Sequence, residues 1–261
     1  MARIYPLFSS SSGNSYFIGT ASGGILIDAG ASCRRLVSAL RQNDIPPEAV
    51  KAVFITHDHS DHIAGLRVFT KNYPVPVYAS PATLEWLERG GHIASIGKSI
   101  PIGGREEAAG YFVTSFKTPH DAIESVGYRI STPDNKTVCI CTDLGHVTPE
   151  VDACMCGCDA VLIESNYDEG MLRSGPYPYC LKRRIASSDG HLSNSMSARE
   201  VRRLIDAGTT RVILGHLSRE NNTPIVARNT LERELGGECV AGRDFLLYIA
   251  PVETEGMAVV F

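Results

Sequence analysis

Short apolar runs that end in polar or charged residues recur along the chain and predict a framework of buried β-strands. Each run has the length and the β-branched content of a strand that is covered on at least one face. We expect strands at residues 15–18, 24–27, 50–55, 75–79, 112–116, 126–130, 138–141, 160–163 and 211–214. Apolar residues at helical spacing predict helices at 32–42, 63–69 and 81–89, which favours the α/β class.

One long stretch shows neither pattern. The segment from Gly90 to Gly110 is rich in glycine and lacks a period, and we expect surface loops and an edge hairpin there. Before the first predicted strand, residues 9–15 form a polar segment between apolar runs. A tight turn and an anion-binding nest of backbone amides are equally compatible with this segment.

The composition is that of a globular chain with a large core, since 43% of its 261 residues are apolar and 21% are charged. No apolar stretch is long enough to span a bilayer, and the first residues lack a signal-type apolar region. We therefore expect a cytoplasmic protein whose eight cysteines are free thiols. The cluster Cys154, Cys156 and Cys158 lacks a second cysteine pair at zinc-ribbon spacing, which favours a structural role.

Charge is spread unevenly along the chain. The net charge is −4, yet residues 171–235 hold eleven Lys or Arg against six Asp or Glu. Such a local excess is compatible with a substrate that carries phosphate, although runs of charge are more often solvated faces.

The densest chemistry lies in the segment from Thr56 to His62, between a predicted strand and a predicted helix. Alternate side chains of an extended segment point the same way, so His57, His59 and Asp61 converge on one point. His62 joins them from the first helical turn. Imidazole and carboxylate groups at this spacing suit zinc, manganese or iron(II).

Further groups that can bind metal follow the ends of other predicted strands, namely His120, Asp143 and His216. Strand ends at one rim of a sheet sandwich converge in space even when they are distant in sequence. A division of the chain would separate these groups, so we expect one domain that spans residues 1–261.

The pattern His-x-His-x-Asp-His after a buried strand resembles the signature of the metallo-β-lactamase superfold. That resemblance implies a four-layer αββα sandwich and a metal-dependent hydrolase that holds two divalent ions, whether zinc, manganese or iron. It also implies the ligands: one ion is held by His57, His59 and His120, the second by Asp61, His62 and His216, and Asp143 bridges the two. Asp28, at the end of a strand, corresponds to an aspartate that buttresses the histidine turn.

Glu164 and His191 occupy the order and context of a Glu/His pair in enzymes similar to tRNase Z, where the pair protonates the leaving oxygen. With Asp61, they are the expected catalytic residues. An imidazolium oriented by a carboxylate is a sound general acid at neutral pH. The alternative for His191 is a residue that precedes a helix, because Ser197 to Glu200 has the form of a capping box.

A narrower resemblance, from about residue 5 to 230, is to the bacterial YycJ/WalJ branch. It rests on Ser10–Ser15, His120-Asp121-Ala122, Thr142-Asp143-Leu144-Gly145, Glu164–Asp168, Leu181–Ile185, Gly190–Asn194 and His216–Asn222. It implies a phosphodiesterase, and more narrowly a DNA 5′-to-3′ exonuclease, that uses a metal-bridging hydroxide as nucleophile. Nucleic acid, with DNA favoured, is the implied partner.

Two other functions remain open at this point. Thioester or lactone hydrolases of the glyoxalase II or lactonase type use the same seven ligands, but they have less need of the Glu164 and His191 pair. A non-catalytic regulator would be free to lose ligands, and the complete ligand set argues against it.

Overall fold

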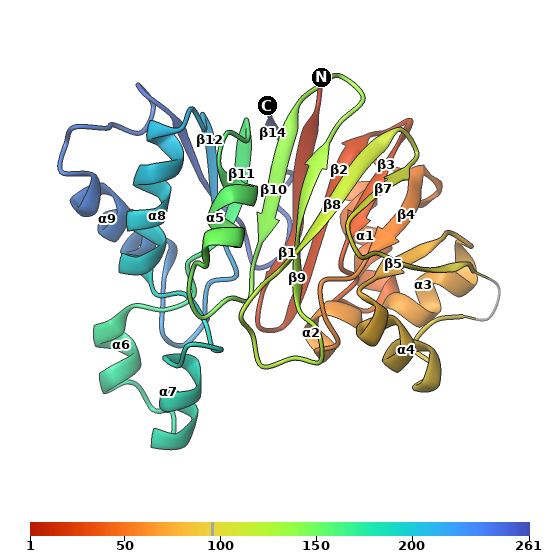
Figure 1. Cartoon of the computed structure of the whole chain (residues 1–261), viewed down its shortest axis with the longest axis horizontal. Helices are drawn as coiled ribbons and strands as arrows, with labels where there is room; N and C mark the ends of the chain where they lie inside the picture. The colour runs from red at the N-terminus through yellow and green to blue at the C-terminus, as the bar shows by residue number, and fades with distance from the viewer. Residues whose placement is uncertain (95–96) are drawn as a thin grey trace.

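The computed structural model describes residues 1–94 and 97–261, and two β-sheets form its centre (Figure 1). The strands of the first sheet, in spatial order, are β14 (Val259–Val260), β1 (Arg3–Ser10), β2 (Gly13–Thr20), β3 (Gly23–Ile27), β4 (Val50–Phe54), β5 (Val77–Ala79) and β6 (Ser99–Pro101). Those of the second are β13 (Leu246–Ile249), β12 (Arg211–Gly215), β11 (Ala160–Glu164), β10 (Thr137–Cys141), β9 (Val126–Ser131), β8 (Tyr111–Lys117) and β7 (Arg105–Ala108).

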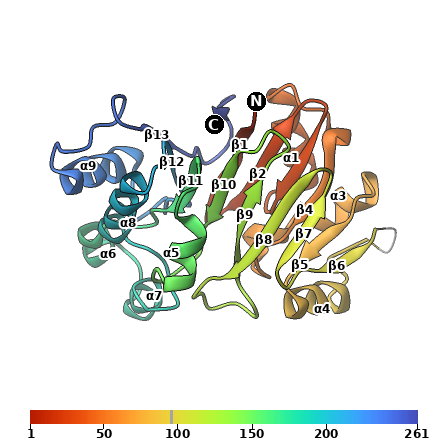
Figure 2. The same ribbon diagram turned by 45° about the horizontal axis from the view of Figure 1, so that its top comes forward.

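Helices lie on the outer face of each sheet, as the two views in Figures 1 and 2 show. On the side of the first sheet are α1 (Cys33–Gln42), α2 (Ser60–Ile63), α3 (Leu66–Asn72), α4 (Pro81–Arg89) and the 3₁₀ turn η1 (Pro47–Ala49). On the side of the second are α5 (Pro149–Met155), α8 (Asn194–Asp206) and α9 (Pro224–Leu235), while α6 (Glu169–Ser174) and α7 (Tyr179–Ile185) project beyond them. The expected four-layer αββα sandwich is confirmed.

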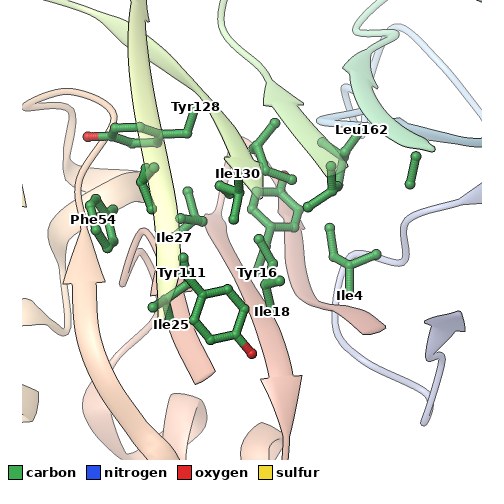
Figure 3. Packing of buried hydrophobic residues seen from close by; sticks show 14 of the residues in the cluster. Ile4, Tyr16, Ile18, Ile25, Ile27, Phe54, Tyr111, Tyr128, Ile130 and Leu162 are labelled. Carbon is green, nitrogen blue, oxygen red and sulfur yellow. The ribbon is translucent and has the colours of Figure 1, made fainter. Parts of the chain in front are cut away.

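The alternation of side chains along each strand builds three apolar layers. In β3, Ile25 and Ile27 point into the core between the sheets (Figure 3). Leu26, between them, packs against the helices on the outer face. In β11 of the other sheet, Leu162 enters the shared core and Val161 faces outward. Because both faces of these strands are covered, their sequences are continuous apolar runs.

Strand direction decides where the loops that carry polar groups leave the sheets. Strands β3 to β6 are mutually parallel, as are β10 to β13. Strand β8 is antiparallel to β9, which is antiparallel to β10, so β8 runs in the direction of β10. The segments after β8, β10, β11 and β12 therefore leave the second sheet at the same end of its strands.

The predicted strands all form, but the predicted helix at 63–69 is wrong in its extent. It consists of two short helices, α2 and α3, which are interrupted at Ala64 and Gly65. The backbone amide of Gly65 donates to the carbonyl oxygen of Ala29, and a Cβ on Gly65 would lie 2.2 Å from the carbonyl oxygen of Ala31. The helix breaks here because the chain docks against the loop that follows β3.

Two further expectations are corrected. The segment from Gly90 to Gly110 contains the edge strand β6 as well as the β7 strand of an edge hairpin, and residues 95 and 96 lie outside the described residues. The capping box at Ser197 is wrong, because α8 begins at Asn194 and its N-cap is Ser193, whose hydroxyl accepts from the amide of Met196.

The eight cysteines all lie in the described ranges, and each is a free thiol, as expected. In the part of the chain that the structure covers, none of the helices combines the length and the apolar character that crossing a membrane requires.

Candidate metal centre

The histidine motif occupies the turn between β4 and α2. His57 is fully buried after the strand, His59 is the N-cap of α2, and Asp61 and His62 belong to the helix itself. The ring centroid of His57 lies 4.7 Å from that of His59 and 4.0 Å from that of His62. The side chains therefore meet as expected, although Asp61 reaches the site from a helical turn and not from an extended segment.

The remaining predicted ligands come from loops at the ends of three strands of the second sheet. His120 follows β8, Asp143 follows β10, and His216 follows β12. Donor atoms lie within 4.8 Å of one another in overlapping groups, which include His57, His59 and His120; His57, His62 and Asp143; and Asp61, His62 and His216. All seven predicted ligands are thus brought to one place.

Three residues that follow strand ends at the site adopt a left-handed backbone conformation, which sequence analysis did not anticipate. The φ angles are 59° at Asp28, 57° at Asp143 and 52° at His216. Each residue follows a parallel strand, and the left-handed turn directs its side chain into the site. Aspartate and histidine tolerate this conformation better than most residues, yet it still costs on the order of 1–3 kcal/mol at each position.

Hydrogen bonds fix the orientation and the tautomer of three histidines. The Nδ1 atom of His62 lies 2.8 Å from the Asp28 carboxylate, that of His216 lies 2.7 Å from Glu164, and that of His120 lies 3.0 Å from a backbone carbonyl oxygen. Because each acceptor requires a proton on Nδ1, the neutral form of each ring carries no proton on Nε2. An unprotonated Nε2 atom that faces the site is the form that binds a metal.

Thr56 links His57 to the same arrangement. Its hydroxyl donates to Asp28 at 2.9 Å, and its amide donates to the other carboxylate oxygen at 2.8 Å. The hydroxyl has only one proton, so it accepts from Nδ1 of His57, which lies 3.0 Å away. One buried carboxylate therefore orients both His57 and His62, as expected for Asp28.

Several buried polar atoms in the site have no hydrogen-bond partner among the described residues. They are Nε2 of His57, Nε2 of His216 and Oδ2 of Asp143. Buried polar atoms without partners are costly and uncommon, and here all three belong to predicted ligands that face the same space. This donor set of imidazole and carboxylate fits divalent metal ions.

The electrostatics of the site also favour cations. Burial lowers the pKa of His62, but Asp143, Asp28 and Asp61 outweigh it and raise this pKa to about 10. Burial is likewise outweighed at His216, where Asp143 and Glu164 raise the pKa to about 9. The carboxylates that hold these protons also attract a metal cation, and the protons are released when the metal binds.

Glu164, at the end of β11, is fully buried and accepts five hydrogen bonds, the longest of them from Nδ2 of Asn166 at 3.5 Å. The other donors are the amides of Leu144 and Leu192, at 3.1 and 2.9 Å, and Nδ1 of His191 and His216, at 2.9 and 2.7 Å. Burial raises the pKa of Glu164, but His191 and His216 outweigh it and lower the pKa to about 2. Glu164 is therefore ionised, and it positions a predicted ligand as well as His191.

Of the two imidazoles that bond to Glu164, those of His191 and His216, that of His191 is the more accessible. Its side chain is 17% exposed, and its ring centroid lies 5.1 Å from that of His120 and 5.3 Å from that of His216. Because Nδ1 is bonded to Glu164, Nε2 is the atom available to a substrate.

Asn14 is a member of the site that sequence analysis missed. Its Nδ2 atom lies 3.2 Å from Oδ2 of Asp61 and 3.0 Å from Nε2 of His62, and its side chain is fully buried. The polar segment 9–15 was the available signal. It forms a tight two-residue turn between β1 and β2, and Asn14 lies in β2 just beyond this turn.

Close packing of the loops holds Asp61 in place. A Cβ on Gly30 would lie 1.6 Å from the carbonyl oxygen of Asp61 and 2.6 Å from the amide of Asn14. Only glycine allows these backbones to approach so closely.

Comparison with known proteins gives consistent matches. Residues 24–217 match the family described as Beta-lactamase superfamily domain. The chain is 35% identical over 253 residues to exodeoxyribonuclease WalJ of Streptococcus pneumoniae strain D39, a match that covers 95% of this chain and 94% of that one. It is also 35% identical over 231 residues to exodeoxyribonuclease YycJ of Bacillus anthracis, with 88% and 87% covered.

A solved structure shows the same fold. The metallo-β-lactamase fold protein YhfI of Bacillus subtilis superimposes with a TM-score of 0.73 at 17% identity, covering 99% of this chain and 98% of that one. The chain therefore belongs to the β-lactamase superfamily, where it has the metallo-β-lactamase fold and groups with the WalJ and YycJ proteins.

Proposed function

We propose that the protein is a dinuclear metal-dependent phosphodiesterase that degrades DNA as an exonuclease from the 5′ end. The observation that carries this proposal is the Glu164–His191 pair, which lies directly beside the seven predicted ligands. The names of the WalJ and YycJ relatives, both exodeoxyribonucleases, support the same activity.

The donors support two metal positions that share one carboxylate. His57, His59 and His120 surround the first, and Asp61, His62 and His216 surround the second. Asp143 lies between them, with Oδ2 3.3 Å from Nε2 of His62 and Oδ1 3.8 Å from Nε2 of His120. Zinc, manganese and iron(II) all suit this set of ligands. Two ions held by these residues would supply a water of lowered pKa as nucleophile and Lewis acidity toward the phosphoryl oxygens.

The residues of the chain supply the remaining chemistry. Glu164 holds Nδ1 of His191, so the imidazole presents Nε2 to the leaving oxygen and donates a proton from that atom. Asn14 and Gly30 hold Asp61, and Asp28 holds His57 and His62, so the donor atoms are positioned before substrate binds.

The direct test is hydrolysis of end-labelled DNA by the purified protein with added Mn²⁺. The substrates are duplex DNA, single-stranded DNA and RNA, each with a 5′-phosphate or a 5′-hydroxyl. We expect stepwise release of nucleotides from the 5′ end of DNA and loss of this activity in Asp143→Ala. No cleavage by a protein shown to hold two metal ions would refute the proposal.

His191→Ala separates this function from thioester or lactone hydrolysis, which needs the general acid less. We expect its kcat for phosphodiester cleavage to fall about 10²- to 10⁴-fold, the usual worth of a general acid. Any lactone hydrolysis should fall far less, and an equal loss of both activities would count against the role of His191.

A cytoplasmic location belongs to the same proposal. The eight cysteines in the described ranges are free thiols, and a reducing compartment keeps thiols in this state.

A further inference from the structure

Helices α6 and α7 form a small unit of their own beside the metal centre. Figure 1 shows both helices projecting from the layer that contains α8. Tyr167, Leu172 and Ile185 form a separate apolar cluster there, with Tyr177 and Leu181 packed against it. None of these five residues contributes to the three layers of the sandwich, so the unit adds a surface that the fold itself does not require.

A cleft of about 400 Å³ lies between the two helices, and we call it the α6–α7 cleft. Tyr167 and Leu172 contribute to its apolar wall, and Tyr179 also lines the cleft. Tyr179 is 76% exposed, which is unusual for a large aromatic side chain that has apolar neighbours within reach. The Tyr179 side chain is therefore accessible to a ligand in the cleft, with the guanidinium carbon of Arg183 6.0 Å from the centroid of its ring.

The rim of the α6–α7 cleft is positively charged. Arg173, Lys182 and Arg183 line it, against a single carboxylate from Glu169. Within residues 1–94 and 97–261, none of the three cations is ion-paired with a carboxylate. Since the whole chain carries −4, this is a local concentration of positive charge and not a general basic coat.

The C-terminal end of α7 connects the cleft to the metal centre. Arg184 forms an ion pair with Asp121, the residue next to His120, and the carbonyl oxygen of Ile185 accepts from the amide of His191 at 2.9 Å. Tyr179 lies five residues before Arg184, which is about 8 Å along the helix. A flexible chain whose scissile bond meets His191 therefore has a short route along α7 into the cleft.

We propose that the α6–α7 cleft binds an unpaired nucleotide of the substrate strand. Its base stacks on Tyr179, and the cations of the rim bind the neighbouring phosphates. An aromatic face within a basic groove is the usual means of binding single-stranded nucleic acid without sequence preference. Charge complementarity favours this polyanion over an apolar partner, and a base still paired in a duplex would not expose its face. This inference rests on the proposed phosphodiesterase function.

The test measures binding of a short, fluorescently labelled thymidine oligonucleotide by anisotropy. Its phosphorothioate linkages resist cleavage, so the full chain is used with its metal ions bound. Tyr179→Ala should weaken binding about 5- to 150-fold, the range for loss of one base–aromatic stack, whereas Tyr179→Phe should retain affinity. Arg183→Gln should lower the slope of log affinity against log salt by about 0.7, the value for one phosphate contact to a single strand.

The matched control is Phe112→Ala. Phe112 lies near the start of β8, at the end of the strand away from His120. Arg105 lies 4.4 Å over the ring of Phe112, as Arg183 lies 6.0 Å over that of Tyr179, so both variants remove an exposed aromatic ring beside an arginine. Phe112→Ala should leave binding unchanged. Equal affinity of the wild type and Tyr179→Ala would overturn the inference, as would undiminished binding of an oligonucleotide that lacks bases.

The proposed function and this inference can be refuted separately. Oligonucleotide binding that depends on Tyr179, without cleavage of the normal phosphodiester, would retain the cleft and refute the nuclease. Cleavage of single-stranded DNA with unchanged KM in Tyr179→Ala would retain the nuclease and refute the cleft. Tyr179-dependent binding of RNA as tight as that of DNA would support the cleft and show that it does not select the sugar.

Discussion

Replacement of Asp28 by asparagine should weaken metal binding without a change in any predicted ligand. Asp28 accepts from the amide and the hydroxyl of Thr56 and from Nδ1 of His62. In Asp28→Asn, an NH₂ group replaces the oxygen that accepts from the Thr56 hydroxyl and from Nδ1 of His62. This group is a donor, so it cannot accept either bond. His62 must then move its proton to Nε2, the atom that faces the site. We expect metal affinity to fall 10- to 100-fold, or by about 1.4–2.8 kcal/mol.

The assay is a competitive titration of Zn²⁺ between the protein and a chelator, and NMR of the ring nitrogens of His62 reports the tautomer. Asp159→Asn is a matched control, because Asp159 accepts from the amide of Thr137 at 2.8 Å, from its hydroxyl at 3.0 Å and from Lys136 at 2.8 Å. Thr137 begins β10, so this similar arrangement lies at the end of the strand away from Asp143 and the metal centre. Wild-type zinc affinity in Asp28→Asn, or an equal loss in both variants, would refute the reasoning.

Three further predictions concern stability. Metal at 100 times its Kd should stabilise the protein by about 2.7 kcal/mol and raise its Tm by about 5–10 °C in calorimetry, and Asp143→Ala should abolish this shift. Burial raises the pKa of Glu200 to about 7, so the folded state holds a proton that the unfolded state releases near pH 4.5. Stability from this proton is complete below pH 4.5 and is lost as the pH rises through 7. The stability advantage of wild type over Glu200→Gln in urea unfolding should therefore shrink by on the order of 1–2 kcal/mol between pH 5 and 8, and a constant difference would contradict this assignment. Gly30→Ala should destabilise the protein by about 3 kcal/mol or more. Gly103→Ala should be neutral in the same assay, because among the described residues no heavy atom beyond its chain neighbours would lie within 4 Å of the added Cβ.

Most of the strands and the principal donors could be predicted from the sequence, but β1, β13 and β14 were missed. Strands such as β3 and β11 are covered on both faces, so their apolar runs are visible without knowledge of their partners. The Thr56–His62 motif was equally visible, because its donors are close in sequence and follow one strand. The recurrence of His120, Asp143 and His216 after strand ends also predicted their convergence.

The contacts that hold those donors in place are visible only in the folded structure. The contacts of Asn14 with Asp61 and of Glu164 with His216 join residues far apart in the chain, and no local pattern records them. The break between α2 and α3 has the same origin, since Gly65 bonds to the loop after β3 in preference to continuing a helix. The α6–α7 cleft likewise depends on packing, because a count of charges located the basic segment but not the face that it forms.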